Sequence, residues 1–95
     1  MVIQVKGYLT FRPLIPERRI EFIETGVTLR DLLISLAKET DALFKTWIYD
    51  QEGSGLQRGV AILINGCHYT HLQEGLETML RDGDQVSIFP PIAGG

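Results

Sequence analysis

The chain has 95 residues, of which 44% are hydrophobic and 22% charged, with a formal net charge of −3 at pH 7. This composition suits one globular domain with a single core, and the scattered Lys and Arg residues leave no basic surface for nucleic acid or an anionic membrane. The single cysteine, Cys67, excludes an internal disulfide and fits a reducing compartment. The N-terminus has no apolar signal core, and no run approaches the roughly 18 apolar residues of a membrane span. We therefore expect a cytoplasmic protein with neither nucleic acid nor membrane as a partner.

The N-terminal segment predicts a β-hairpin. Apolar and polar residues alternate from the N-terminus to about residue 11, and one face of this strand is formed by Ile3, Val5, Leu9 and Phe11. Pro13 and Pro16 end the strand, because each proline fixes φ and lacks the N–H that a sheet requires. A second strand is predicted at residues 17–24, with Ile20 and Phe22 facing inward.

The most regular helix is predicted at residues 28–39. Thr28 is suited to cap its first turn, and Asp31 places a negative charge near the positive end of the helix dipole. Five apolar residues recur at the spacing of one helical face: Leu29, Leu32, Leu33, Leu36 and Ala37. A shorter helix is predicted around residues 42–48, and Gly53-Ser54-Gly55 is typical of a loop tip.

The second half of the chain predicts short strands that are separated by tight turns. Asn65-Gly66 is typical of a two-residue hairpin turn, and Gly83 stands between two aspartates in a second turn. The predicted elements are a buried strand at 60–64, a strand at 67–70 with Cys67 toward the core, one helical turn at 76–80, a turn at 82–84 and a last strand at 85–89.

This order of elements predicts an α+β fold of the β-grasp (ubiquitin-like) type, with a mixed sheet of about four to five strands and one main covering helix. Residues 1–89 form the predicted domain, and residues 90–95 form an extended C-terminal tail that ends in Gly-Gly. Because one fold hosts many functions, the function has to be argued from the site.

The tail, Pro-Pro-Ile-Ala-Gly-Gly, is the segment best suited to chemistry. Pro90 and Pro91 direct it stiffly away from the sheet, and the small residues Ala93, Gly94 and Gly95 fit a narrow channel. The Gly95 carboxylate is an accessible acyl group that adenylation with ATP would activate. A sulfur nucleophile could then produce a thiocarboxylate, without any catalytic side chain in this chain.

Residues 82–95, Asp-Gly-Asp-Gln-Val-Ser-Ile-Phe-Pro-Pro-Ile-Ala-Gly-Gly, closely resemble the C-terminus of the small subunit of molybdopterin synthase and its relatives in the MoaD/ThiS family of sulfur carriers. The resemblance implies that an E1-like enzyme consumes ATP to adenylate Gly95. A cysteine desulfurase or a rhodanese-like protein would supply the sulfur for the thiocarboxylate. The tail would then enter the active site of the large subunit of molybdopterin synthase, with Gly94 beside Gly95 in the channel. This implies a chain that is not an enzyme on its own and that binds no cofactor.

Two departures from the family leave the pathway open. Residues 40–59 form a longer segment than the shortest members have, and the first strand lacks their Phe-Ala-Arg-like run. The thiamine-pathway carrier ends similarly, but usually without the Phe-Pro-Pro element. The alternatives are sulfur delivery for thiamine, cysteine, tRNA or a tungsten cofactor, or conjugation to lysines as a ubiquitin-like modifier. A different class is a non-catalytic β-grasp interaction module with an idle tail.

Phe89 is the candidate anchor for a partner. In the last strand Val86 and Ile88 share the inward face, so Phe89 is expected to point outward beside the tail. An exposed aromatic at this place suggests partner docking, and the alternative is a ring that folds back over the rim of the sheet. The predicted partner-binding residues are Phe89, Pro90, Pro91, Ile92, Ala93 and Gly94.

Cys67, His68 and His71 lie close enough in the sequence to suggest a metal. A strand, however, would send Cys67 and His68 to opposite faces, and a zinc site normally requires four ligands. We therefore predict no metal site. Trp47 and Tyr49 are predicted to be aromatics at the edge of the core.

Overall fold

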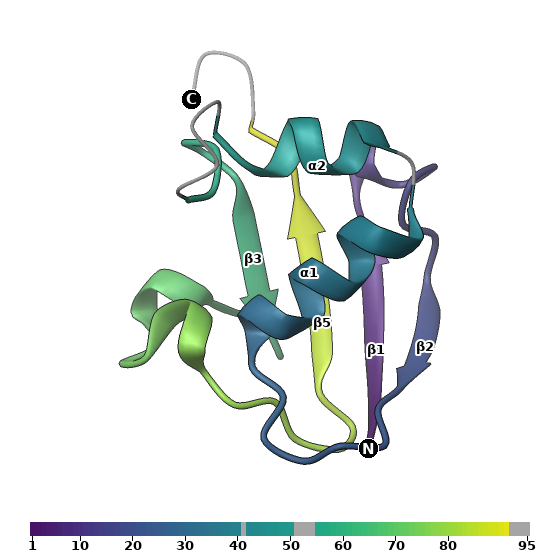
Figure 1. Ribbon diagram of the computed structural model, residues 1–95. Coiled ribbons are helices and arrows are strands. Elements are labelled where there is room, and N and C mark those ends of the chain that lie inside the picture. Colours follow the sequence, from purple (N-terminus) through teal and green to yellow (C-terminus); the bar gives the residue numbers. More distant parts are fainter. Residues whose placement is uncertain (41, 51–54, 92–95) are drawn as a thin grey trace.

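A computed structural model describes residues 1–40, 42–50 and 55–91 (Figure 1). These residues form a five-stranded sheet in the order β2-β1-β5-β3-β4, with two α-helices across one of its faces. The central strands β1 and β5 run parallel and the other pairs run antiparallel, so the sheet is mixed. The elements are β1 (Val2–Gly7), β2 (Arg18–Glu21), α1 (Leu29–Glu39), α2 (Ala42–Ile48), β3 (Ala61–Ile64), β4 (Cys67–His68) and β5 (Gln85–Phe89), with 3-10 turns η1 (Leu9–Phe11), η2 (Tyr69–His71) and η3 (Gly75–Glu77). The predicted α+β β-grasp fold is confirmed.

The N-terminal hairpin forms as predicted, although β2 is shorter than expected. β1 and β2 are antiparallel, with Ile3 opposite Ile20. The prediction that the first strand continues through Leu9 and Phe11 on its inward face is wrong. The chain leaves the sheet after Gly7 and forms η1, where Leu9 is 62% exposed while Phe11 is buried.

Close backbone packing at Gly7 explains this early exit from β1. The Gly7 N–H donates to the Ile15 carbonyl oxygen at 2.8 Å, so the following loop folds back against the strand. A Cβ atom at Gly7 would lie only 2.6 Å from the Phe11 carbonyl oxygen, a distance that no side chain tolerates. The turn also places Leu9 at a φ of 54°, which is uncommon for a leucine.

Helix α1 confirms its predicted cap and its predicted apolar face. The Thr28 side chain accepts from the Asp31 N–H, and the Asp31 carboxylate accepts from the Thr28 N–H, which completes a capping box. The four leucines of the inward face are buried, and Ala37 packs against them. The short helix α2 also forms where it was predicted and buries Phe44 and Ile48.

The β3–β4 hairpin forms around Asn65 and Gly66, whose φ values of 52° and 84° are those that a two-residue turn of this kind requires. β4 is shorter than predicted, because the chain enters η2 directly after His68. Cys67 is exposed, so its predicted place toward the core is wrong. β4 is a two-residue strand at the edge of the sheet.

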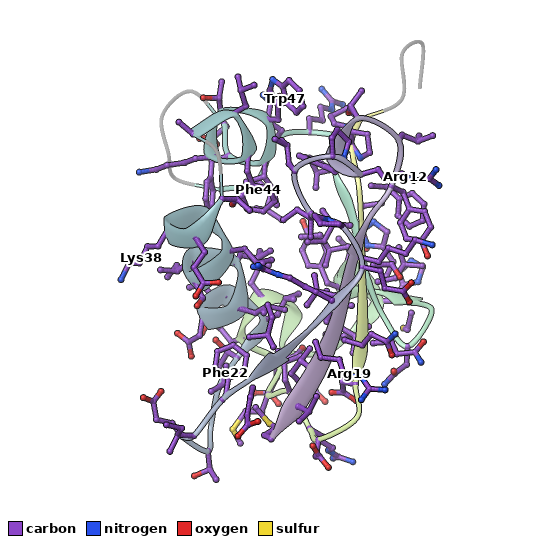
Figure 2. The ribbon with its side chains drawn as sticks, turned by 90° about the vertical axis from the view of Figure 1, so that its right-hand side faces the viewer. Arg12, Arg19, Phe22, Lys38, Phe44 and Trp47 are labelled. Carbon is purple, nitrogen blue, oxygen red and sulfur yellow. The ribbon has the colours of Figure 1, made fainter. Side chains whose placement is uncertain are left out.

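Seen from the β2 edge, the helices and the sheet form two layers, with Phe44 between them and Arg19 on the outer side of the sheet (Figure 2). The core fills the space between these layers, and all of its buried members are apolar. The opposite face of the sheet, which we call the open face, has no helix over it in the described part of the chain. Neither described helix has the length and apolar character that a membrane crossing requires.

Candidate functional site at the base of the tail

The tail base, which we define as Phe89, Pro90 and Pro91, lies at the end of a central strand. β5 is held between β1 and β3, with Phe89 opposite Ala61 of β3. The Tyr8 N–H donates to the Ile88 carbonyl oxygen at 2.9 Å, so the ladder with β1 continues to the last residues of β5. The predicted site residues Ile92, Ala93, Gly94 and Gly95 lie outside the described residues.

Phe89 points to the open face, as the alternation of β5 predicted, while Val86 and Ile88 are buried on the helix side. Its ring stacks on the ring of Tyr8, with centroids 4.3 Å apart and planes 9° from parallel. Lys6 Nζ lies 4.9 Å from the centroid of the Tyr8 ring, within the range of a cation–π interaction. Phe89 is therefore an outward residue that a neighbouring ring holds in a defined orientation.

The two prolines of the tail base have different surroundings. Pro90 is buried, whereas Pro91 is exposed. Pro91 lies against Gly59, which directly precedes Val60 and β3: a Cβ atom added at Gly59 would be 3.2 Å from the Pro91 Cβ. The chain is thus held by packing as far as Pro91.

The open face near the tail base combines aromatic, apolar and basic side chains. The strand registers align Lys6, Ser87 and Leu63 in one row across the sheet, and Phe89 and Ala61 in the next. Tyr8 continues the alternation of β1 on the same face as Lys6. We call Tyr8, Leu63 and Phe89, which are candidates for contact with a partner, the partner surface.

Sequence reasoning missed Tyr8, Leu9 and Gly59 as candidate site residues. For Tyr8 the signal was present. Residues two apart in a strand lie on the same face, so Tyr8 places an aromatic ring on the face of the polar residues Gln4 and Lys6. No comparable local signal exists for Leu9 or Gly59. Their places depend on a loop closure and on a strand register.

The two side chains with a resolved pKa shift, Arg30 and Tyr49, belong to α1 and to the residue after α2. Arg30 of α1 forms an ion pair with Glu77 of η3, and the hydrogen bond to Glu77 raises the Arg30 pKa. Burial raises the pKa of Tyr49, which follows α2. The ion pair between Arg30 and Glu77 joins α1 to the η3 turn and therefore serves the fold.

The histidines next to Cys67 also have local partners. His68 Nδ1 accepts from the Thr70 N–H at 3.2 Å and caps the η2 turn. Within residues 1–40, 42–50 and 55–91, no three His, Cys, Asp or Glu side chains form a group that could hold a metal ion.

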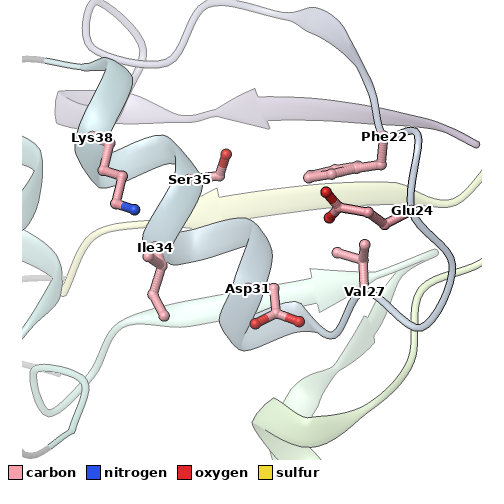
Figure 3. A pocket seen from close by; sticks show the side chains of 7 residues that line it. All are labelled: Phe22, Glu24, Val27, Asp31, Ile34, Ser35 and Lys38. Atoms are coloured by element: carbon pink, nitrogen blue, oxygen red, sulfur yellow. The ribbon is translucent and has the colours of Figure 1, made fainter.

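A pocket of about 310 Å³ lies between α1 and the chain that follows β2 (Figure 3). Phe22 and Val27 form apolar parts of its wall, and Asp31 and Lys38 of α1 lie on its rim. Asp31 already serves the capping box of α1. The pocket opens on the helix side, whereas the partner surface lies on the open face, so the two are separate features.

Comparison with known proteins identifies the family of the chain. Residues 10–95 match the ThiS family. The chain is 38% identical to small archaeal modifier protein 3 of Haloferax volcanii, over 100% of both chains. The solution structure of small archaeal modifier protein 1 of Methanosarcina acetivorans is similar at a TM-score of 0.76 and 34% identity, over 99% of this chain and 96% of that one.

A further similar structure is a Pyrococcus furiosus protein provisionally assigned as molybdopterin converting factor subunit 1, with a TM-score of 0.69 and 31% identity over 97% of this chain and 99% of that one. These relatives share the β-grasp fold and nearly the full length of the chain. The chain belongs to the ThiS family of small ubiquitin-like carrier and modifier proteins.

Proposed function

We propose that this chain is a sulfur carrier whose Gly95 carboxylate is adenylated by an E1-like enzyme and then converted into a thiocarboxylate. The proposal rests on one observation: the match to the ThiS family extends through Gly94-Gly95. Adenylation would join a Gly95 carboxylate oxygen to the α-phosphate of ATP and release pyrophosphate. A sulfur nucleophile would then displace AMP, and no side chain of this protein needs to take part.

The geometry of the described residues supports this role. The tail base leaves the end of β5, a central strand with neighbours on both sides, so a firm support lies behind a tail that has to enter another protein. The stacked pair of Tyr8 and Phe89 lies beside this exit on the open face. A partner that takes up the tail could therefore bind the partner surface at the same time, and aromatic anchors commonly dominate such contacts.

For the sulfur acceptor we propose the precursor of molybdopterin, with this chain acting as the small subunit of molybdopterin synthase. The Phe-Pro-Pro element before the diglycine favours this acceptor, as does the similarity to the Pyrococcus furiosus protein at 31% identity. The active site would then belong to the large subunit, and this chain would supply the thiocarboxylate. ATP would be consumed by the activating enzyme, and a cysteine desulfurase or a rhodanese-like protein would supply the sulfur as a persulfide. The persulfide would displace AMP to form an acyl disulfide, and a thiol would cleave its S–S bond, leaving the thiocarboxylate on Gly95 and a disulfide on the donor.

A second candidate function uses the same activated glycine for conjugation to lysine side chains of other proteins. The full-length similarity to small archaeal modifier protein 3, at 38% identity, favours this alternative. Both functions require the same adenylated Gly95, and they differ only in the nucleophile that attacks it.

Intact-mass spectrometry tests the shared step. The purified chain is incubated with the E1-like enzyme of its organism, ATP and a sulfur source, and we expect the mass gain of one sulfur atom in place of one oxygen atom. A variant that lacks Gly95 is the control and should gain nothing. A parent chain that stays unmodified with an active enzyme would contradict the proposal.

The acceptor is tested in two further experiments. The thiocarboxylated chain, mixed with the large synthase subunit and the cyclic pterin precursor, should lose its sulfur and regenerate the carboxylate. Lysine-linked adducts of this chain on cellular proteins, found by peptide mass spectrometry, would instead establish the modifier function.

A further inference from the structure

The register between β3 and β5 brings Gly59 opposite Pro91. The two strands are antiparallel with Ala61 opposite Phe89, so the residues that lie two positions beyond this pair face each other as well. The structure shows this contact directly. A Cβ atom built on Gly59 would lie 3.2 Å from the Cβ and 3.5 Å from the Cα of Pro91.

Gly59 lies in a turn that the rest of the fold holds in place. Its φ is +91°, a value that side chains disfavour, and the turn is closed by the Val60 N–H, which donates to the Gln57 carbonyl oxygen at 3.1 Å. The Gln57 N–H donates in turn to the Ile48 carbonyl oxygen at the end of α2, at 2.7 Å. Gly59 is the last residue of the 40–59 segment, which is longer here than in the shortest family members, and its position beside the tail base is thus fixed by these hydrogen bonds.

If a Cβ is added at Gly59, Pro91 is the residue that has to move. Pro90 is buried and Phe89 is paired with β3 and stacked on Tyr8, so the chain up to Pro90 is confined. Pro91 is exposed and lies beyond the last residue of β5, outside the ladders that this strand forms with β1 and β3. A displacement would therefore begin at Pro91.

We propose that Gly59 is a positioning residue for the tail: because glycine has no side chain, Pro91 packs directly against it, and this contact sets the direction in which the chain leaves the domain at Pro91. This inference rests on the proposed function, in which an activating enzyme has to receive the Gly95 carboxylate in its active site. A small misplacement of a reacting group is enough to lower the rate of such a reaction strongly.

The chain contains a matched control for this effect. Gly83, in the turn before β5, has a φ of +88°, close to the value at Gly59, but a Cβ added there would meet nothing within 4 Å. Gly59→Ala and Gly83→Ala therefore introduce a similar backbone strain, and only the first disturbs Pro91. Gly59→Asn is a second test variant, because asparagine tolerates a positive φ better than alanine does and also carries a Cβ.

The experiment compares the three variants and the parent as substrates of the E1-like activating enzyme. The rate of adenylation is measured by pyrophosphate exchange. We expect kcat/KM to fall by about tenfold or more for both Gly59 variants relative to Gly83→Ala. Thermal unfolding should show similar losses of Tm for Gly59→Ala and Gly83→Ala. If Gly59 had a purely structural role, two variants with similar losses of Tm would also show similar losses of activation. Equal kcat/KM values for Gly59→Ala and Gly83→Ala would overturn the inference.

A measurement on the free chain separates this inference from the proposed function. In the parent, NMR should show a cross-peak between the Gly59 Hα and Pro91 Hβ protons, and Gly59→Ala should shift the Pro91 signals while Gly83→Ala leaves them in place. If neither the parent nor any variant is activated but the NMR signals behave as expected, the proposed function is wrong, whereas the contact between Gly59 and Pro91 is confirmed. If the cross-peak is absent, or if Pro91 is unaffected by Gly59→Ala, the positioning role fails even in a chain that is activated.

Discussion

The two ends of β5 are built differently. At its start, polar groups of the 82–84 turn are paired within the chain: Asp82 Oδ1 accepts from the Val2 N–H at 2.7 Å, and Asp84 Oδ2 accepts from the Arg81 N–H at 2.7 Å. Asn65 links the same turn to the β3–β4 hairpin through its bond to Asp84 Oδ1 at 2.8 Å. At the end of β5, the contacts are ring stacking and the packing of prolines, and Leu9 nearby is 62% exposed.

Under the proposed function, the start of β5 serves the fold and its end serves partner binding. Hydrogen bonds that are satisfied within the chain leave little for a partner to use, whereas exposed apolar and aromatic side chains gain free energy when a partner covers them. The two glycines of similar φ differ in the same way: a Cβ at Gly83, before the start of β5, would meet nothing within 4 Å, whereas Gly59, beside the tail base, lies against Pro91. Substitutions at the start should therefore change stability, and substitutions at the end should change activation and partner binding.

The largest effect is expected from one alanine added after Gly95. The activating enzyme has to reach the carboxylate of a glycine at the end of a narrow tail, so we expect no detectable thiocarboxylate on the extended chain, with an unchanged Tm. Intact mass measures the sulfur gain and confirms that the added alanine is still present. Sulfur on the extended chain, with the alanine retained, would show that a free diglycine end is not required.

Phe89→Ala should weaken binding to the activating enzyme by about tenfold, since buried aromatic anchors are common hot spots. Loss of the stack with Tyr8 should also lower the free energy of unfolding by about 1 kcal/mol. Isothermal titration and urea unfolding measure the two effects. Tyr8→Phe, which keeps both rings, should change neither much. A loss of several kcal/mol of stability without weaker binding would make Phe89 a core residue instead.

At the start of β5, Asp84→Ala should affect stability alone. It removes the acceptor for the Arg81 N–H and for Asn65 Nδ2, which should lower the free energy of unfolding by about 1–2 kcal/mol. Urea unfolding measures this loss, and the rate of adenylation of the folded variant should equal that of the parent. A parallel fall in adenylation would mean that the two ends of β5 are not independent.

Leu9→Asn should weaken enzyme binding by a smaller factor, about threefold, because Leu9 lies at the margin of the partner surface. Asparagine tolerates the φ of 54° better than leucine, so stability should be unchanged or slightly higher. Ile23→Asn is a matched control, since Ile23 is 96% exposed and lies after β2, outside the partner surface. If both variants weaken binding equally, Leu9 has no specific role.

The smallest effect concerns Tyr49, which belongs to neither end of β5. Burial raises the pKa of its hydroxyl above the ordinary value of 10.0 in the folded state. The folded chain therefore retains this proton longer than the unfolded chain, and the resulting stability is fully present below pH 10 and is lost as the pH rises through the folded pKa. Unfolding from pH 9 upward should show a slightly shallower loss of stability for Tyr49→Phe than for the parent. Identical pH profiles would exclude the shift.

Much of the fold could be predicted because its elements have local signatures. Thr28 and Asp31 stand at the spacing of a capping box, and the leucines of α1 repeat at helical spacing, so both features lie within one segment. The alternation of β5 likewise predicted that Phe89 points outward. The early end of β1 could not be predicted, since Gly7 and Ile15 meet only when the intervening loop closes. The exposure of Cys67 depends on β4 lying at the edge of the sheet, which the strand order decides.

By itself, the sequence determined the type and approximate place of each α-helix and β-strand, the β-grasp order and the Gly94-Gly95 motif, because these are recorded in periodicity, turn residues and a short motif. Only the tertiary structure decided which residues surround the tail base. Tyr8 reaches Phe89 across a parallel pair of strands, and Gly59 reaches Pro91 across an antiparallel pair. Such contacts join residues far apart in the chain, and they follow from strand order and register, which no local pattern contains.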